Sequence, residues 1–307
     1  MNTPNEPVPL VEMPTGAQIT FGQGQAGPLA PVEIDPNNPP WGVVAGILTL
    51  VGSIVLLILM AILALLFIIP SIPSNVRGNA AQLQQFLSTD KTSVFLQIVS
   101  TIPAHLLTLV VVWAVVTRFG KRPFWKSIGW SWSEKFGPWK TVGIAVALFA
   151  VGLAIGNILK GPPTEIDQIA NNSIASRYAL AFIASVTAPF IEELVFRGVL
   201  YSALQKAIGI AWSVAIVAFL FALVHVWEYR NNVGVILVIS ILSLSLTLLR
   251  AYSGRLLPSY IVHLIFNGIT AVYIIIEPYL PQSAPDVEHK APALLMLVRS
   301  IRHLFCL

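Results

Sequence analysis

Residues 42–69 read GVVAGILTLVGSIVLLILMAILALLFII, and no charged side chain occurs in this stretch. An α-helix rises about 1.5 Å per residue, so roughly 20 apolar residues cross a bilayer core about 30 Å thick. Further apolar runs follow at residues 92–117, 138–159, 178–206, 210–227, 233–249 and 257–276. The sequence therefore predicts an all-α fold, a polytopic transmembrane helical bundle of about seven spans.

The composition supports this class of protein. Of the 307 residues, 56% are hydrophobic and 10% are charged, whereas about 25% of the residues of a soluble protein are charged. So few charges cannot cover a water-exposed surface, which argues against a soluble enzyme, a disordered protein or a nucleic-acid binder. Cys306 is the single cysteine, so neither an intrachain disulfide nor a cysteine cluster for a metal is expected.

The two ends of the chain differ from the apolar runs between them. Residues 1–41 contain nine of the 22 prolines, four acidic residues and no lysine or arginine, which predicts a disordered, Pro-rich acidic tail rather than a signal peptide. Residues 281–307 form a C-terminal tail whose apolar positions recur at helical spacing around Arg299 and Arg302. An interfacial amphipathic helix is expected there.

The basic residues indicate how the chain is oriented. Six of them fall in the short connection after the second span, namely Arg118, Lys121, Arg122, Lys126, Lys135 and Lys140. Basic loops stay in the cytoplasm, so the N-terminus is predicted to be cytoplasmic, in a plasma or inner membrane. The tryptophans of the same loop suit anchoring at the lipid headgroups; they are Trp125, Trp130, Trp132 and Trp139.

The three helices predicted within residues 42–160 contain few residues that could act in catalysis. His105 stands alone in the second span beside Pro103, and a histidine in this setting is expected to be packed and hydrogen-bonded. The small-residue pairs Gly42/Gly46 and Gly152/Gly156 predict close helix packing.

The helical core predicted within residues 161–280 is different, because ionisable side chains occur inside its apolar runs. Such residues are costly in a membrane and indicate a functional site. They are Glu192, Glu193, Arg197, His225, His263 and Asn267. Glu193 and Arg197 are four residues apart on one helix face, as are His263 and Asn267. Pro189 is expected to bend the helix one turn before the two glutamates.

A second spacing concerns the turn expected near Gly209. Glu192 precedes this glycine by 17 residues and His225 follows it by 16, so a helical hairpin would place both side chains at a similar depth. A glutamate and a histidine so placed could activate a water molecule, with His263 and Asn267 stabilising an oxyanion. Glu192, His225 and His263 could instead bind zinc with an open fourth position. A buried polar network that only holds the helices together is the remaining alternative.

These residues also form motifs that resemble a known family, the CPBP intramembrane proteases. This family includes the type II CAAX prenyl endopeptidases and bacteriocin-processing or immunity proteins. Its motifs E-E-x-x-x-R, F-x-x-x-H and H-x-x-x-N match the sequence from Glu192 to Arg197, from Phe221 to His225 and from His263 to Asn267. The resemblance covers roughly residues 175–275.

The resemblance implies a role for each matched residue. Glu192 would be the general base, His225 would hold the water, and His263 and Asn267 would bind the scissile carbonyl. Glu193 and Arg197 would support the site, although Glu193 could share the role of base. A zinc-dependent reaction and a metal-free one both agree with these residues, so Zn²⁺ is a possible cofactor and no cofactor is certain.

The function expected from this resemblance is hydrolysis of a peptide bond in a membrane-anchored or lipidated polypeptide, with the lipid bilayer but no nucleic acid as a partner. A non-catalytic scaffold or bacteriocin-immunity protein of the same fold is the alternative, and the absence of repeated hydropathy halves disfavours a transporter. If the predicted spans cross the bilayer alternately, His225 and His263 lie at different depths in the membrane. The two side chains can then meet only through a tilted or broken helix or a water-filled cavity. The segment after His225, from Glu228 to Asn232, could line that cavity or form a solvated loop.

Overall fold

The computed structural model describes residues 34–280, and within them all regular secondary structure is helical. The fold class predicted from the apolar runs is thereby confirmed. The predictions for residues 1–33 of the N-terminal tail and for the C-terminal amphipathic helix lie outside the described residues.

Each predicted span is helical in the structure. The long apolar helices are α1 (Val43–Ile68), α3 (Lys91–Val99) with α4 (Thr101–Thr117), α6 (Pro138–Ile158), the continuous run Ile174–Ile208, α11 (Ile210–Tyr229), α12 (Val233–Ser253) and α13 (Leu257–Ile276). Within the described part of the chain, six of these are long and apolar enough to cross a membrane, and the apolar run of α11, Ile210–Val226, is shorter. The protein is therefore a multi-pass membrane protein.

Short helices connect the spans. They are η1 (Ile69–Ser71), α2 (Ala80–Thr89), α5 (Phe124–Ser127), α7 (Glu165–Asn172) and η4 (Glu277–Tyr279). Polar N-caps explain where two of them begin, because the first backbone N–H groups of a helix need acceptors. The Asn79 side chain accepts from the first turn of α2, and Thr164 forms a capping box with Asp167 in α7.

The run Ile174–Ile208 contains two π-helical segments. It passes through α8 (Ile174–Phe182), the wider π-helical turn η2 (Ile183–Thr187), α9 (Ala188–Glu192), a second π-helical segment η3 (Glu193–Leu200) and α10 (Tyr201–Ile208). Pro189 lies in the second position of α9 and has no N–H to donate. Wide π-helical turns therefore flank the helix that contains Pro189, and wide turns of this kind occur frequently at functional sites.

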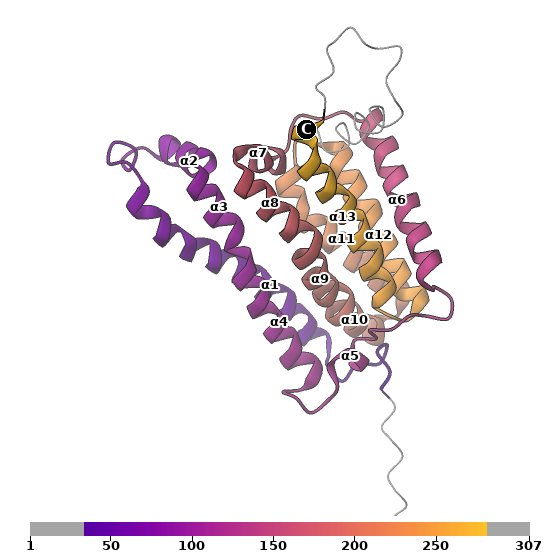
Figure 1. The fold of residues 1–307 in the computed structure, drawn as a ribbon. Coiled ribbons are helices and arrows are strands. Elements are labelled where there is room, and N and C mark those ends of the chain that lie inside the picture. The colour runs from indigo at the N-terminus through magenta and orange to yellow at the C-terminus, as the bar shows by residue number, and fades with distance from the viewer. Residues whose placement is uncertain (1–33, 281–307) are drawn as a thin grey trace, which may run out of the picture. The chain divides into compact units, whose positions relative to one another are not determined.

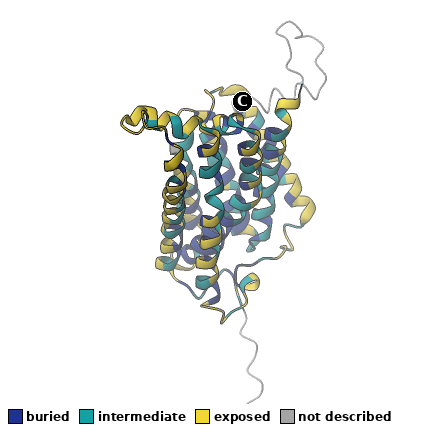
Figure 2. Ribbon diagram, turned by 60° about the vertical axis from the view of Figure 1, so that its left-hand side comes forward, coloured by how far each residue is buried: buried dark blue, intermediate teal, exposed yellow. Residues whose placement is uncertain are grey.

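The helices with polar residues lie next to one another. α12 packs between α11 and α13, α6 packs against α12 and α13, and α1 pairs with α4 and contacts η3 (Figure 1). One apolar core surrounds η3 and includes Leu194, Val199 and Leu200. A second core lies between α6, α12 and α13. Figure 2 shows that the buried residues gather between the helices and the exposed ones follow their outer faces.

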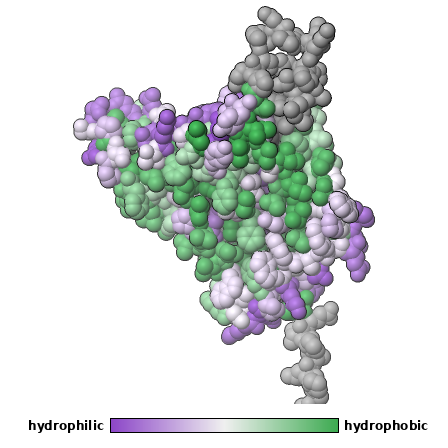
Figure 3. All heavy atoms as spheres, in the orientation of Figure 1, coloured by the Kyte–Doolittle hydropathy of each residue, from purple (hydrophilic) through white to green (hydrophobic). Residues whose placement is uncertain are grey.

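Many of those exposed residues are apolar. Leu48 and Ile58 of α1 and Leu106 and Val110 of α4 are more than half exposed. Figure 3 shows hydrophobic residues covering much of the helix surface on the face drawn, with hydrophilic residues toward its ends. In water such a surface would be strongly unfavourable, whereas lipid chains match it.

Residues 34–41 differ from the predicted disordered tail, because they pack against the helix ends. The Trp41 indole donates to Val199 O at 3.0 Å and its side chain is buried. Arg250 is fully buried and donates to Asn37 Oδ1 at 2.8 Å and to Pro36 O at 3.2 Å. A buried guanidinium needs acceptors, and this Pro-rich segment supplies them without helix or strand formation.

Glycines allow two close approaches between helices. A Cβ atom on Gly46 would lie 3.2 Å from the Leu200 Cα, as the predicted close packing requires, whereas Gly42 has no atom within 4 Å of that position. Gly152 and Gly156 are buried in α6. At Gly234, near the start of α12, a Cβ would lie 2.5 Å from the Leu159 backbone oxygen.

We therefore expect Gly234→Ala to lower stability by about 1–3 kcal/mol, since the clash is with backbone and α6 must shift away from α12. Thermal unfolding of the detergent-solubilised protein measures this loss. Gly143→Ala in α6 is the matched control, because no atom lies within 4 Å of its Cβ position. An equal melting temperature for both variants would contradict the close approach.

Candidate active site

A buried ion pair forms the centre of the polar cluster. Arg197 Nη1 lies 3.0 Å from Glu193 Oε1, and both side chains have no exposed surface. The same Glu193 oxygen accepts a hydrogen bond from His263 Nδ1 at 3.1 Å. The structure thus confirms that Glu193 and Arg197 share a helix face, and it adds His263 as a second donor to this carboxylate.

Residues of α12 complete the environment of Arg197, and sequence reasoning missed them. Arg197 donates from Nε to Thr247 Oγ1 at 3.2 Å and from Nη2 to both the backbone oxygen and the Oγ of Ser243 at 3.1 Å. The Phe221 ring covers the guanidinium, with its centroid 4.3 Å from Cζ. The sequence contained a signal for this contact, because Ser243 and Thr247 are hydroxyl residues four positions apart in an otherwise apolar helix.

Glu192 has a different environment from its neighbour Glu193. Its side chain is 26% exposed, and Oε2 lies 3.7 Å from His263 Nε2. His263 therefore lies between the two glutamates, with one ring nitrogen toward each. Because a carboxylate only accepts hydrogen bonds, the proton of the contact with Glu193 belongs to Nδ1, and a neutral His263 presents its Nε2 lone pair to Glu192.

His225 lies beside this group but makes its own contact within α11. Its Nδ1 donates to the Phe221 backbone oxygen at 2.7 Å. Its ring centroid lies 4.8 Å from that of Phe221, whose centroid is in turn 5.8 Å from that of His263. The spacing around Gly209 predicted that Glu192 faces His225, whereas the imidazole that contacts the Glu192 carboxylate is that of His263.

Asn267 ties α13 to the first wide turn of the neighbouring run. Its Nδ2 donates to Ala184 O at 2.9 Å, within η2. A π-helical turn disturbs the regular backbone hydrogen-bond pattern, so this side chain satisfies an acceptor there. An amide has two N–H donors, and this contact uses one of them.

The predicted zinc ligands do not form a metal site. Among the described residues, no three histidine, cysteine, aspartate or glutamate side chains are grouped closely enough to hold a metal ion. Glu192, His225 and His263 therefore do not fit the tetrahedral set that zinc requires. The contacts of His263 with Glu193 and of His225 with Phe221 O are hydrogen bonds within the protein instead.

Aromatic side chains from the basic loop pack close to this cluster. Trp130 packs on Tyr260 of α13 and on Phe190 of α9, with ring centroids 4.9 and 5.7 Å apart. Phe190 is two residues before Glu192. Trp139 is 87% exposed, as expected of a headgroup anchor. Trp130 differs from that expectation, because it packs against the helices that carry the site.

The segment after His225 is mostly a helix end rather than a cavity lining. Asn232 caps α12 through the Val235 N–H, and Arg230 lies 3.9 Å from Glu165 in an exposed pair. Glu228 lies in the last turn of α11, three residues after His225.

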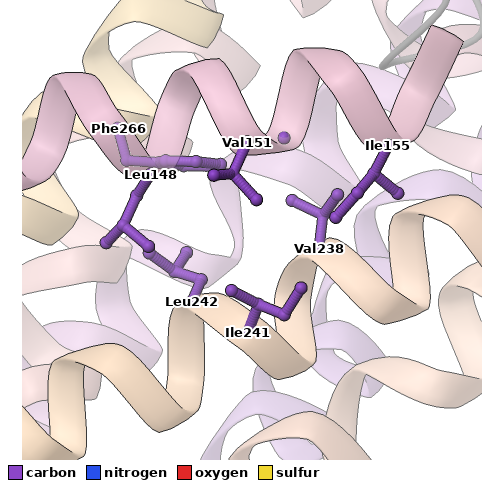
Figure 4. Close-up of a pocket in the computed structure, with 8 residues that line it drawn as sticks. Leu148, Val151, Ile155, Val238, Ile241, Leu242 and Phe266 are labelled. Carbon is purple, nitrogen blue, oxygen red and sulfur yellow. The ribbon is translucent and has the colours of Figure 1, made fainter.

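A shallow recess lined by apolar side chains lies elsewhere, between α6, α12 and α13. Figure 4 shows that Leu148 and Val151 of α6 face Val238 and Leu242 of α12 across it, with Phe266 at one end. No polar side chain lines this recess, so it offers no chemistry for hydrolysis.

Comparison with protein families matches residues 174–269 to the family described as Type II CAAX prenyl endopeptidase Rce1-like. The predicted family resemblance is confirmed. The matched residues include all three motifs, from Glu192 to Asn267, and the family supports an intramembrane protease-type function. No curated protein and no solved structure matches the chain.

Proposed function

We propose that the chain is an intramembrane endopeptidase that hydrolyses a peptide bond with a water molecule activated by Glu192. The observation that carries this proposal is the contrast between the two adjacent glutamates. Glu193 is fully buried and paired with Arg197, whereas Glu192 is partly exposed beside His263. A general base must reach both a water molecule and the substrate, and Glu192 is the carboxylate available for this role.

The nucleophilic water is placed between Glu192 Oε2 and His263 Nε2. These atoms are 3.7 Å apart, and a water molecule can donate one hydrogen to each of two acceptors at this separation. Glu193 holds the opposite ring nitrogen of His263, which fixes both the tautomer and the orientation of the ring. This assignment moves the water from His225, where the family resemblance put it, to His263.

The reaction then follows from these contacts. The water oxygen attacks the carbonyl carbon while Glu192 takes one of its protons, and the second N–H of Asn267 donates to the oxyanion that forms. Glu192 then passes the proton to the leaving nitrogen as the C–N bond breaks, which restores the carboxylate. His225 retains Nε2 for a contact with the substrate. No step requires a metal ion.

The proposed substrate is a membrane-anchored or lipidated polypeptide. The site lies on helices whose outer surfaces match lipid, so a substrate held in the bilayer reaches it without leaving the membrane. We place the protein in a plasma or inner membrane with a cytoplasmic N-terminus, because six basic residues fall in the short connection after the second span and basic loops stay in the cytoplasm.

The direct test is cleavage of a panel of fluorogenic lipidated peptides by the purified protein in oxygen-18 water. We expect one product to gain one oxygen-18 atom in its new carboxylate. His263→Ala should abolish this incorporation, and a chelator should leave it unchanged. A loss of activity with chelator that zinc restores would contradict the metal-free reaction.

A scaffold or bacteriocin-immunity protein on the same fold is the second candidate, since the polar network around Arg197 also holds helices together. The two candidates differ in what His263→Ala does. If the protein is a scaffold, wild type and variant should both form no more product than a sample of the peptide without protein. If it is a protease, only the wild type should cleave the peptide.

A further inference from the structure

His105 lies on α4, outside the residues that match the family. It is half-buried within a predicted membrane span. An ionisable side chain in such a position is costly and indicates a function. The helix that carries it contacts η2, α9 and η3, the three segments that precede, contain and follow Glu192.

The contact that His105 makes is with the catalytic run itself. His105 Nδ1 lies 3.0 Å from Thr187 Oγ1. Thr187 is the last residue of the wide turn η2 and the N-cap residue of α9, the five-residue helix that ends at Glu192. Any displacement of Thr187 is therefore transmitted through a single short helix to the carboxylate.

The wide turn is held from two sides. On one side Asn267 of α13 donates to Ala184 O at 2.9 Å, and on the other His105 of α4 bonds to Thr187. A regular α-helix needs no such contacts, because its own backbone fixes it. The π-helical turn is less well fixed, and side chains of neighbouring helices set its position instead.

We propose that His105 is a positioning residue for the hydrolytic site. It fixes the start of α9, and with it the Glu192 carboxylate at the other end of that short helix, through the contact with Thr187. This inference rests on the proposed function, because it assigns the residue to the same general base. It extends the site to the N-terminal helices, which the family motifs do not include.

The kinetic test uses variants of both partners. We expect His105→Leu to lower kcat about 10-fold to 100-fold, since small displacements of a catalytic group have effects of this size, and to leave KM within about two-fold. His105→Gln can still bond to Thr187 and should recover part of kcat. Thr187→Val removes the same contact and should lower kcat to a similar extent, and the double variant should be no worse than either single variant.

Ser185→Ala is the matched control, because Ser185 lies in the same wide turn but donates to Ala181 O of its own helix. Its kcat should equal that of the wild type. Equal kcat losses in Ser185→Ala and Thr187→Val, or additive losses in the double variant, would contradict a specific role for the His105–Thr187 contact.

A second measurement needs no peptide cleavage and so separates this inference from the proposed function. In protein labelled with nitrogen-15 histidine, the His105 signals are assigned by their loss in His105→Gln. We expect Thr187→Val, which removes the hydroxyl partner of His105, to shift them and Ser185→Ala to leave them unchanged. Unchanged His105 signals in Thr187→Val would overturn the proposal, whether or not any peptide is cleaved.

Discussion

Glu192→Gln is expected to lower kcat for peptide hydrolysis by about 10³-fold, because an amide cannot take the proton of the attacking water. The substitution keeps the size of the side chain and removes no buried ion pair, since Glu192 is partly exposed and 3.7 Å from His263. We therefore expect the melting temperature and KM to change little. Steady-state kinetics on the peptide that the wild type cleaves, together with thermal unfolding, measures all three quantities.

Glu193→Gln is the matched control at the neighbouring position, with the opposite expected result. Glu193 is fully buried against Arg197, so its neutralisation leaves a buried guanidinium without its carboxylate and lowers the melting temperature. If Glu192→Gln retains wild-type kcat while Glu193→Gln remains folded but inactive, the roles of the two glutamates are reversed. The proposed mechanism would then be wrong in its choice of base.

The spans were predictable because a membrane helix is defined by composition. An uninterrupted run of about 20 apolar residues has few alternatives in a bilayer, and each predicted run is helical. The wide turns η2 and η3 were not predictable in the same way. Pro189 indicated an irregularity, but which backbone pattern replaces the regular one depends on the contacts that Asn267 and His105 make with η2.

The site was predictable in its residues but not in its pairings. Ionisable residues in apolar helices are rare, so Glu192, Glu193, Arg197, His225 and His263 stood out. Glu192 and His225 are almost equally far along the chain from Gly209, which suggested that they contact each other. This spacing does not tell on which face of its helix each side chain lies. The contact of Glu192 with His263 arises because α13 brings that ring between the two glutamates.

Two other features could not be predicted, because their partners lie far away in the sequence. His105 has no ionisable neighbour in its own helix, so its partner Thr187, 82 positions later, could not be inferred from spacing. Residues 34–41 were predicted to be disordered because their composition favours neither helix nor strand. In the structure Arg250 binds this segment through Asn37 and the Pro36 carbonyl. The composition of the segment could not reveal a partner so far away in the sequence.

The largest stability effect is expected for Arg197→Leu. In this variant Glu193 stays fully buried without a guanidinium beside it, while its carboxylate keeps the hydrogen bond from His263. Removing one partner of a buried pair costs about 3–5 kcal/mol, because the other charge stays in a low-dielectric environment. The hydrogen bonds to Thr247 and Ser243 disappear as well, so α12 no longer has its polar attachment to η3. Thermal unfolding in detergent should show a large drop in melting temperature.

Two comparisons distinguish this buried pair from an ordinary ion pair. Arg230→Leu removes the exposed pair with Glu165, whose nearest charged atoms are 3.9 Å apart, and exposed pairs contribute only about 0–1 kcal/mol. Glu193→Gln combined with Arg197→Leu removes both charges while keeping an acceptor for the His263 Nδ1–H, so the double variant should be more stable than Arg197→Leu alone. If the double variant is instead less stable by the sum of the two single effects, the uncompensated Glu193 charge is not the cause of the destabilisation. The attachment of Arg197 to α12 would then account for it.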